Sequence, residues 1–136
     1  MTDLHSYYLS TLYKVEDFKH PIVIGQTHLE LEGLLLKRNV THWSYLTAWN
    51  PKSQSLPNDE NRTRNQTLFN EIHAKPSYLV LNGVGESPDG HWSEESFLVL
   101  GMTEKEAVFL AKKFEQNAFV CGEKGKPARL VFVEFS

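Results

Sequence analysis

The spacing of apolar residues alternates along this chain between the period of a helix and that of a strand, and this alternation constrains the fold most. The clearest helix is 103–116, which begins with a capping box at Thr103. Residues 77–85 and 96–101 have the composition of strands, and Pro88-Asp89-Gly90 between them is typical of a turn. These segments predict an antiparallel hairpin followed by a helix.

The same alternation extends over the rest of the chain. Helices are predicted at 4–13, 29–39 and 58–74, and strands at 22–24, 40–49, 118–121 and 129–135. The predicted order is α-β-α-β-α-β-β-α-β-β, with Asn58 as the N-cap of the third helix. This order favours an α+β fold, a mixed β-sheet with packed helices. We expect one sheet to hold 40–49, 77–85, 96–101 and 129–135, with helices 58–74 and 103–116 packed on it. Because 136 residues suffice for one core, we expect a single globular domain over residues 1–136.

Composition and charge argue against several classes of protein. The longest apolar runs, such as 33–36 and 97–100, are far shorter than the ~18 residues of a membrane span. The first residues lack the basic and apolar segments of a secretory signal, and a single cysteine agrees with a reducing compartment, so we expect a cytoplasmic protein. The net charge of −3 comes without a basic stripe, and we therefore expect no nucleic-acid partner and no membrane partner.

The usual motifs of catalytic and metal centres are missing from the sequence. There is no P-loop, no G-x-S-x-G and no H-E-x-x-H, and the histidines are scattered. Cys121 follows two apolar residues of a strand, where a thiol is usually inert. We therefore expect neither a bound metal nor a cofactor.

One group of polar residues needs an explanation. Residues 58–67 contain no apolar side chain, yet they form the first half of a helix that continues through Leu68 and Ile72. Continued backward, the apolar stripe reaches Arg64 or Asn65 and then Asn61, so polar groups point inward there. Together with Asn50 and Ser53 they could form a ligand site beyond the end of strand 40–49. The alternative is that these residues are solvated or cap the carbonyls of the loop.

A second group lies between 85 and 96, in a stretch with several acids and neither lysine nor arginine. Glu94 and Glu95 are adjacent, so they should point to opposite faces of a strand. With His91 the carboxylates could bind a divalent cation, although no metal-binding motif is present. The alternative is an exposed hairpin tip that is anchored by Trp92. An inward guanidinium is costly unless it is paired, so we expect Arg64 to be held by a carboxylate or by an anionic ligand and not to be freely solvated. Glu94 or Glu95 is the expected partner.

Four groups of residues together resemble a bacterial family catalogued as domain of unknown function 3293. They are the run TAWNPKS at 47–53, the pair Asn61 and Arg64, PDGHWSEES at 88–96 and FEQNA at 114–118. The resemblance spans about Tyr8 to Val133, with Ser93 where proline is more often expected and Glu115 where glycine is common. It implies a small bacterial cytosolic protein without an assigned activity.

Three functions remain open from the sequence. The first is a module that binds a small anionic ligand or a protein partner. The second is a hydrolase-like enzyme in which Glu94 or Glu95 is the general base and Arg64 stabilises negative charge. The third is a structural module whose acidic hairpin meets a basic surface. The oligomeric state cannot be predicted. The candidate ligand-binding residues are Trp49, Asn50, Ser53, Asn61, Arg64, Trp92, Glu94 and Glu95.

Overall fold

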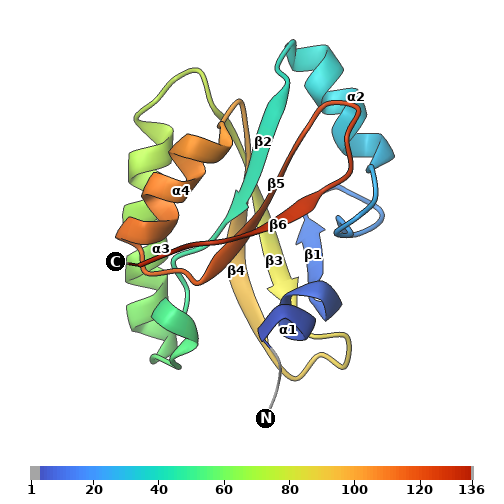
Figure 1. The fold of residues 1–136 in the computed structure, drawn as a ribbon. Coiled ribbons are helices and arrows are strands. Elements are labelled where there is room, and N and C mark those ends of the chain that lie inside the picture. Colours follow the sequence, from blue (N-terminus) through green and yellow to red (C-terminus); the bar gives the residue numbers. More distant parts are fainter. Residues whose placement is uncertain (1–3, 136) are drawn as a thin grey trace.

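The computed structural model describes residues 4–135, whose strands form one curled sheet (Figure 1). The strands are β1 (Leu12–Val15), β2 (His42–Leu46), β3 (Leu79–Glu86), β4 (Ser93–Leu100), β5 (Ala118–Glu123) and β6 (Arg129–Phe132). Their order across the sheet is β1-β3-β4-β2-β5-β6, and each neighbouring pair is antiparallel. The four segments that were expected to share a sheet do so.

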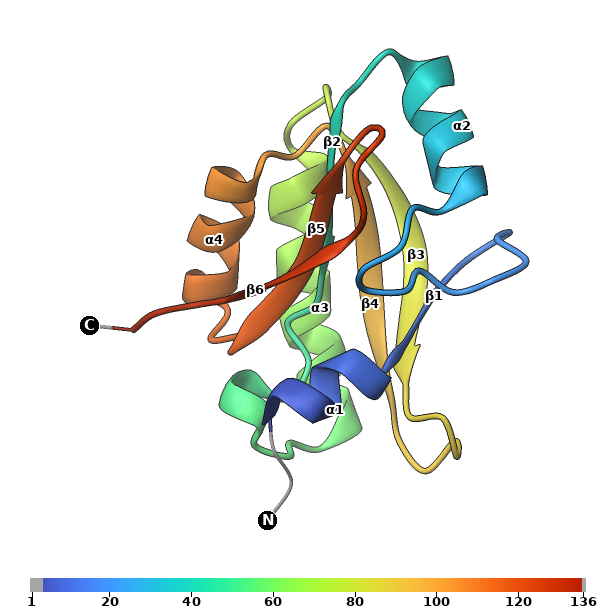
Figure 2. The same ribbon diagram turned by 45° about the vertical axis from the view of Figure 1, so that its right-hand side comes forward.

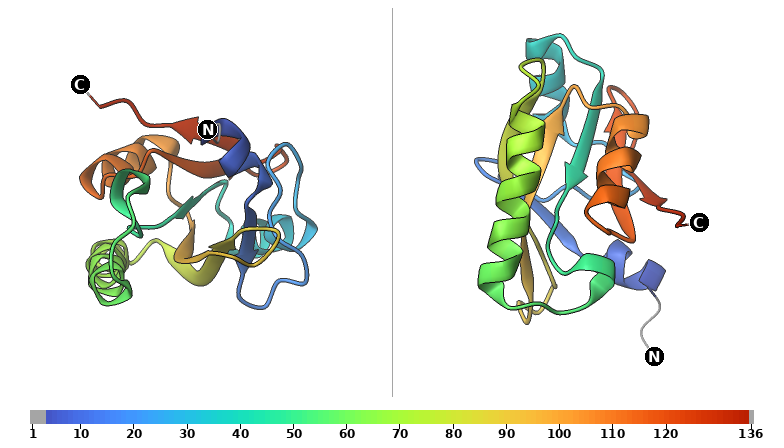
Figure 3. Two further views of the ribbon diagram at one scale, coloured as in Figure 1. Left: turned by 90° about the horizontal axis from the view of Figure 1, so that it is seen from below. Right: turned by 90° about the vertical axis from the view of Figure 1, so that its left-hand side faces the viewer.

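Helices lie on both faces of this sheet. They are α1 (Leu4–Ser10), α2 (Leu29–Arg38), α3 (Asn58–His73) and α4 (Glu104–Lys113). The face that carries α3 and α4 is called the outer face, and the face that carries α1 and α2 the inner face (Figures 1 and 3). The capping box of α4 forms as expected, since the Thr103 hydroxyl accepts from Glu106 N–H and the Glu106 carboxylate accepts from Thr103 N–H. The α+β class is confirmed and the order of elements roughly so, although the strands pair antiparallel throughout and do not form the expected mixed sheet.

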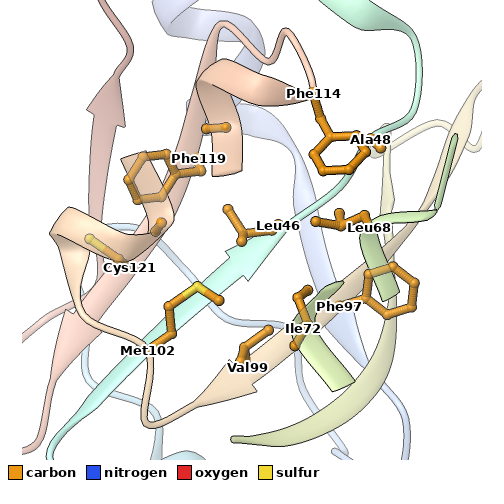
Figure 4. Close-up of a cluster of buried hydrophobic side chains, with 12 residues drawn as sticks. Leu46, Ala48, Leu68, Ile72, Phe97, Val99, Met102, Phe114, Phe119 and Cys121 are labelled. Carbon is orange, nitrogen blue, oxygen red and sulfur yellow. The ribbon is translucent and has the colours of Figure 1, made fainter. Parts of the chain in front are cut away.

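The outer-face core explains why α3 and α4 pack where they do. Leu68 and Ile72 of α3 are almost fully buried against Leu46 of β2 and Val99 of β4, and Figure 4 shows these side chains converging. Small residues of α4, among them Ala107, let that helix approach the sheet. Burial of each large side chain contributes roughly 1.5–3 kcal/mol, so this core fixes α3 along its second half.

A second core lies under α2 on the inner face. Leu31 and Leu35 of α2 are buried against Trp43, Leu98 and Val120 of the central strands. Because α2 covers only one end of this face, the other end is left to the short helix α1 (Figure 2).

Two predictions near the N-terminus were wrong. The first helix ends at Ser10 and not at Tyr13, because 12–15 forms β1 and pairs with β3, which buries Tyr13 and Val15. Residues 22–24 form no strand. Instead, Ile22 makes an isolated antiparallel bridge to Tyr13, and Ile24 makes a parallel bridge to Ala128. This segment thus links β1 to the turn that precedes β6, a long-range arrangement that local patterning does not encode.

The start of α3 also differs from the prediction. The N-cap residue is Pro57, which provides no side-chain cap, whereas Asn58 is already helical. The first turn still contains Asp59 and Glu60, whose negative charges suit the helix dipole.

Candidate functional site

A pocket lies on the inner face, at the end of the sheet that α2 leaves uncovered. The helix α1, the turn Pro51–Ser53 and the tip of the β3–β4 hairpin meet at this end (Figures 1 and 2). The pocket has a volume of about 50 Å³, which is room for roughly three to five water molecules or a small ligand group. Its aromatic lining comprises Tyr7, Tyr8, Tyr13, Tyr45, Trp49, Trp92 and Phe119.

The helix α1 covers the pocket mainly through its aromatic side chains. Tyr7 stacks on Trp92 of the hairpin with 4.9 Å between ring centroids, and Tyr8 forms a T-shaped pair with Phe132 of β6. The Tyr13 hydroxyl donates a 2.6 Å hydrogen bond to the carbonyl of Tyr8. No residue of α1 is itself fully buried, so a few ring contacts hold this cover in place.

Two glycines of β3 lie opposite polar residues of β4 at this end of the sheet. Gly85 is the register partner of Glu94, and Gly83 is the partner of Ser96. A Cβ at Gly83 would lie 2.8 Å from the hydroxyl oxygen of Tyr45, which donates to the Lys14 carbonyl there. A Cβ at Gly85, which lines the pocket, would make ordinary van der Waals contacts with Thr11 and Ser96, at 3.6 Å and 3.9 Å.

Glu94 is the acidic group of the pocket. It is partly buried, and the Tyr7 hydroxyl donates to its Oε1 across 3.5 Å. Burial raises the pKa of Glu94 to about 7, although hydrogen bonds from Tyr7 and Asn50 oppose the shift. A carboxyl with this pKa exchanges its proton at neutral pH. The tyrosines around it stay protonated, because burial raises the pKa of Tyr8 to about 12 and that of Tyr7 further.

The backbone next to Glu94 is strained. Asn50, Lys52 and Ser53 have φ values of 47°, 51° and 62°, in the left-handed region that favours glycine. Such conformations cost about 1–2 kcal/mol per residue and persist only where the surroundings enforce them. Glu115 also has a positive φ of 58°, and its carbonyl accepts from Lys52 N–H.

Asn61 enforces the conformation of Asn50. Its Oδ1 accepts from Asn50 N–H at 2.8 Å, and its Nδ2 donates to Asn50 Oδ1 at 2.8 Å. Leu56 N–H donates to the same Asn50 oxygen, which fixes the orientation of that amide. The Asn50 Nδ2 is therefore left to donate toward Glu94. Asn61 is fully buried and lies behind the pocket. It supports the lining through Asn50 and is not one of the described lining residues.

Arg64 and Asn65 hold the segment that leaves β2. Arg64 donates from Nε to the Ala48 carbonyl at 2.9 Å and from Nη2 to the Phe114 carbonyl at 2.6 Å. Asn65 accepts from Ala48 N–H and donates to the Glu95 carbonyl. The pairing of Arg64 with Glu94 or Glu95 is wrong, because two backbone carbonyls occupy the guanidinium instead. The guanidinium does approach a carboxylate, but that carboxylate belongs to Glu115, with 3.9 Å between Arg64 Nη1 and Glu115 Oε1.

Glu95 lies outside the pocket. As expected for adjacent residues of a strand, it points to the outer face, where it lies 3.8 Å from Arg62 of α3 and is largely exposed. Together with Asn65 and Phe69 it lines a shallow groove between α3 and the strands.

The structure thus brings together five of the eight residues that the sequence singled out, and separates three. The pocket lining includes Trp49, Asn50, Ser53, Trp92 and Glu94, whereas Asn61, Arg64 and Glu95 lie behind it or on the other face. Sequence analysis missed the tyrosines, which come from α1, β1 and β2 and have no common motif. It also missed Gln116, whose side-chain amide donates to the Trp49 carbonyl at 3.1 Å.

Residues 4–135 hold neither a cluster of metal-ligating side chains nor a helix that could span a membrane. No three His, Cys, Asp or Glu side chains gather there as a metal ion would need. No helix in that range is long and apolar enough to cross a membrane.

Comparison with known proteins places the chain in a family. No curated protein and no solved structure matches it. The model of one family, described as protein of unknown function (DUF3293), matches residues 46–119, which is more than half of the chain. The matched segment contains Glu94 and the strained turn, whereas Tyr7, Tyr8 and Tyr13 precede it. The chain therefore belongs to the DUF3293 family.

Proposed function

We propose that this protein binds a small molecule in the pocket between α1 and the inner face of the sheet, with Glu94 as the polar group that the ligand contacts. The position of Glu94 carries this proposal. Its carboxyl faces a pocket among aromatic rings, and its two hydrogen-bonding neighbours, Tyr7 and Asn50, leave part of its capacity to accept hydrogen bonds unused. Apolar walls with a few polar groups are the usual composition of a ligand pocket.

The backbone around Asn50 supports the same proposal. Three left-handed residues within four positions, held by the buried amide of Asn61 and the guanidinium of Arg64, are an expensive way to make a turn. Strain of this kind concentrates at functional sites, where it positions a particular group. The group that it positions in this protein is the Asn50 amide, which donates toward Glu94.

An enzyme that uses Glu94 as a general acid or base is the second candidate. The pKa of about 7 favours it, because proton transfer is most effective when the pKa of the catalytic group is near the working pH. Arg64 would not serve as the anion-stabilising group, since its Nε and Nη2 donate to carbonyls. For both candidates we propose a cytoplasmic location, which is supported by the buried free thiol of Cys121.

A fragment set of cationic, neutral and anionic small molecules tests binding by ¹H–¹⁵N NMR. Binders are expected to shift the amides of Tyr7, Asn50 and Trp92 together. The Glu94→Gln variant should change which fragments bind, while Glu95→Gln provides a matched control on the opposite face. A set in which no fragment shifts these three residues, or in which every binder maps to the groove beside α3, would overturn the proposal.

A further inference from the structure

We infer that the ligand of this pocket is a small cation, a protonated primary amine with a short apolar chain, whose ammonium group binds the Glu94 carboxylate among the aromatic rings. This inference rests on the proposed function, because it names the chemical class that the same pocket takes. It replaces the anionic ligand that was expected while Arg64 was counted in the site.

The charges that line the pocket favour a cation. Among the described lining residues the only ionisable groups are Glu94 and four tyrosines, and none is a lysine, arginine or histidine. An anion would therefore face Glu94 with no opposite charge beside it. Arg64 does not provide that charge, since its guanidinium faces the carbonyls of Ala48 and Phe114.

The rings favour a cation as well. The faces of tyrosine and tryptophan attract a cation within about 6 Å of the ring centre, and the attraction grows as water is excluded. The pocket combines four tyrosines and two tryptophans with a single carboxyl. Aromatic rings around one acid are a well-known arrangement for recognising ammonium groups.

Hydrogen bonding and size narrow the class to a small primary amine. Oε1 of Glu94 accepts from Tyr7, and the carboxylate still has acceptor positions for a ligand donor. The hydroxyl of Ser53, which also lines the pocket, already accepts from Asn117 and retains acceptor capacity. An ammonium group offers three donors, and a volume of about 50 Å³ limits the apolar part to a few carbon atoms.

The affinity for an amine should depend on pH in a defined direction. The carboxylate form of Glu94 binds the cation, so affinity increases with pH until the carboxyl is ionised. With the pKa near 7, the ionised fraction falls about 30-fold between pH 8 and pH 5.5. Tyr7, Tyr8, Tyr13 and Tyr45 surround Glu94 and have raised pKa values, so they remain neutral in this range.

The test compares butylammonium, butanol and butyrate, which have similar size and different charge. NMR titration of the full chain at pH 8 should show saturable binding of butylammonium at Tyr7, Asn50 and Trp92, with butanol at least tenfold weaker and butyrate absent. Glu94→Gln should weaken butylammonium at least tenfold, and Glu95→Gln should leave it unchanged. Lowering the pH to 5.5 should weaken it about 30-fold in the parent protein only.

The possible failures are distinguishable. If butanol or butyrate binds at these residues as tightly as butylammonium, the cation inference is wrong although the pocket still binds small molecules. If butylammonium binds equally well to Glu94→Gln, the carboxylate is not its partner. If butylammonium leaves the pocket resonances unshifted, the inference fails, and the wider fragment set decides separately whether the pocket binds anything.

Discussion

Replacement of Glu94 by glutamine should make this protein more stable at neutral and alkaline pH. The folded protein holds the Glu94 pKa near 7, against an ordinary value of 4.5, so between these pH values the native state binds more protons than the unfolded state. Stability therefore falls as the pH rises from 4.5 to 7 and levels off above 7. Because the pKa of Glu94 differs by about 2.5 between the two states, the free energy of unfolding should fall by about 3 kcal/mol by pH 8 and by about 1 kcal/mol by pH 5, relative to acidic pH.

Glutamine has the shape of the protonated acid and does not titrate. Any packing change that it causes is independent of pH, so the informative quantity is how the stability difference between Glu94→Gln and the parent changes with pH. This difference should grow by about 2.5 kcal/mol in favour of the variant between pH 5 and pH 8.

Urea unfolding at pH 5, 6, 7 and 8 measures this difference. Glu95→Gln is the matched control, since the Glu95 side chain is exposed on the outer face and lies 3.8 Å from Arg62. Its difference from the parent should vary by less than about 0.5 kcal/mol. A Glu94→Gln difference that stays constant with pH would refute the reasoning, because it would mean that Glu94 ionises as freely in the folded protein as in the unfolded chain.

Three further substitutions test the supports of the pocket, each by urea unfolding at one pH. Asn61→Ala should cost about 2–4 kcal/mol because it leaves Asn50 N–H without its acceptor in a buried site, and a loss below about 1 kcal/mol would contradict this support. Arg64→Ala should cost about 2 kcal/mol and Arg64→Lys about half as much, because lysine lacks the fork that reaches two carbonyls; equal stability of both variants and the parent would show that Arg64 is only a surface residue. Ser44→Ala should be neutral or stabilising by up to about 1 kcal/mol, since the buried Ser44 hydroxyl has no partner within the described residues, and a clear loss would reveal an unseen hydrogen bond.

Local sequence patterns predicted most of the regular structure. The capping box fixed the start of α4, and Pro88-Asp89-Gly90 identified the hairpin tip, where Gly90 has a φ of 75°. Alternation identified the central strands because their two faces are buried in two different cores. Edge strand β1 was missed because four residues are too few for a period to show, and its pairing with β3 is a long-range contact.

The candidate site was predictable in part and for a similar reason. The inward polar stripe of α3 was correct, since Asn61 and Asn65 are buried. Both accept from backbone N–H groups of the loop after β2, as in the capping alternative. Which carboxylate faces the pocket depends on strand register, and the choice of Glu94 over Glu95 follows from the pairing of Gly85 with Glu94. The tyrosines reach the pocket through tertiary folding, and no local spacing connects Tyr7 to Tyr45.

Direct titration of the Glu94 side chain tests the central claim most simply. Its carboxyl carbon can be followed by ¹³C NMR between pH 3 and pH 9, with and without butylammonium. We expect a midpoint near pH 7 for the protein alone. Saturating butylammonium should lower this midpoint, because the cation binds only the ionised form. A midpoint near 4.5, or one near 7 that saturating butylammonium leaves unchanged, would contradict the role of Glu94 as a buried ligand-binding carboxyl.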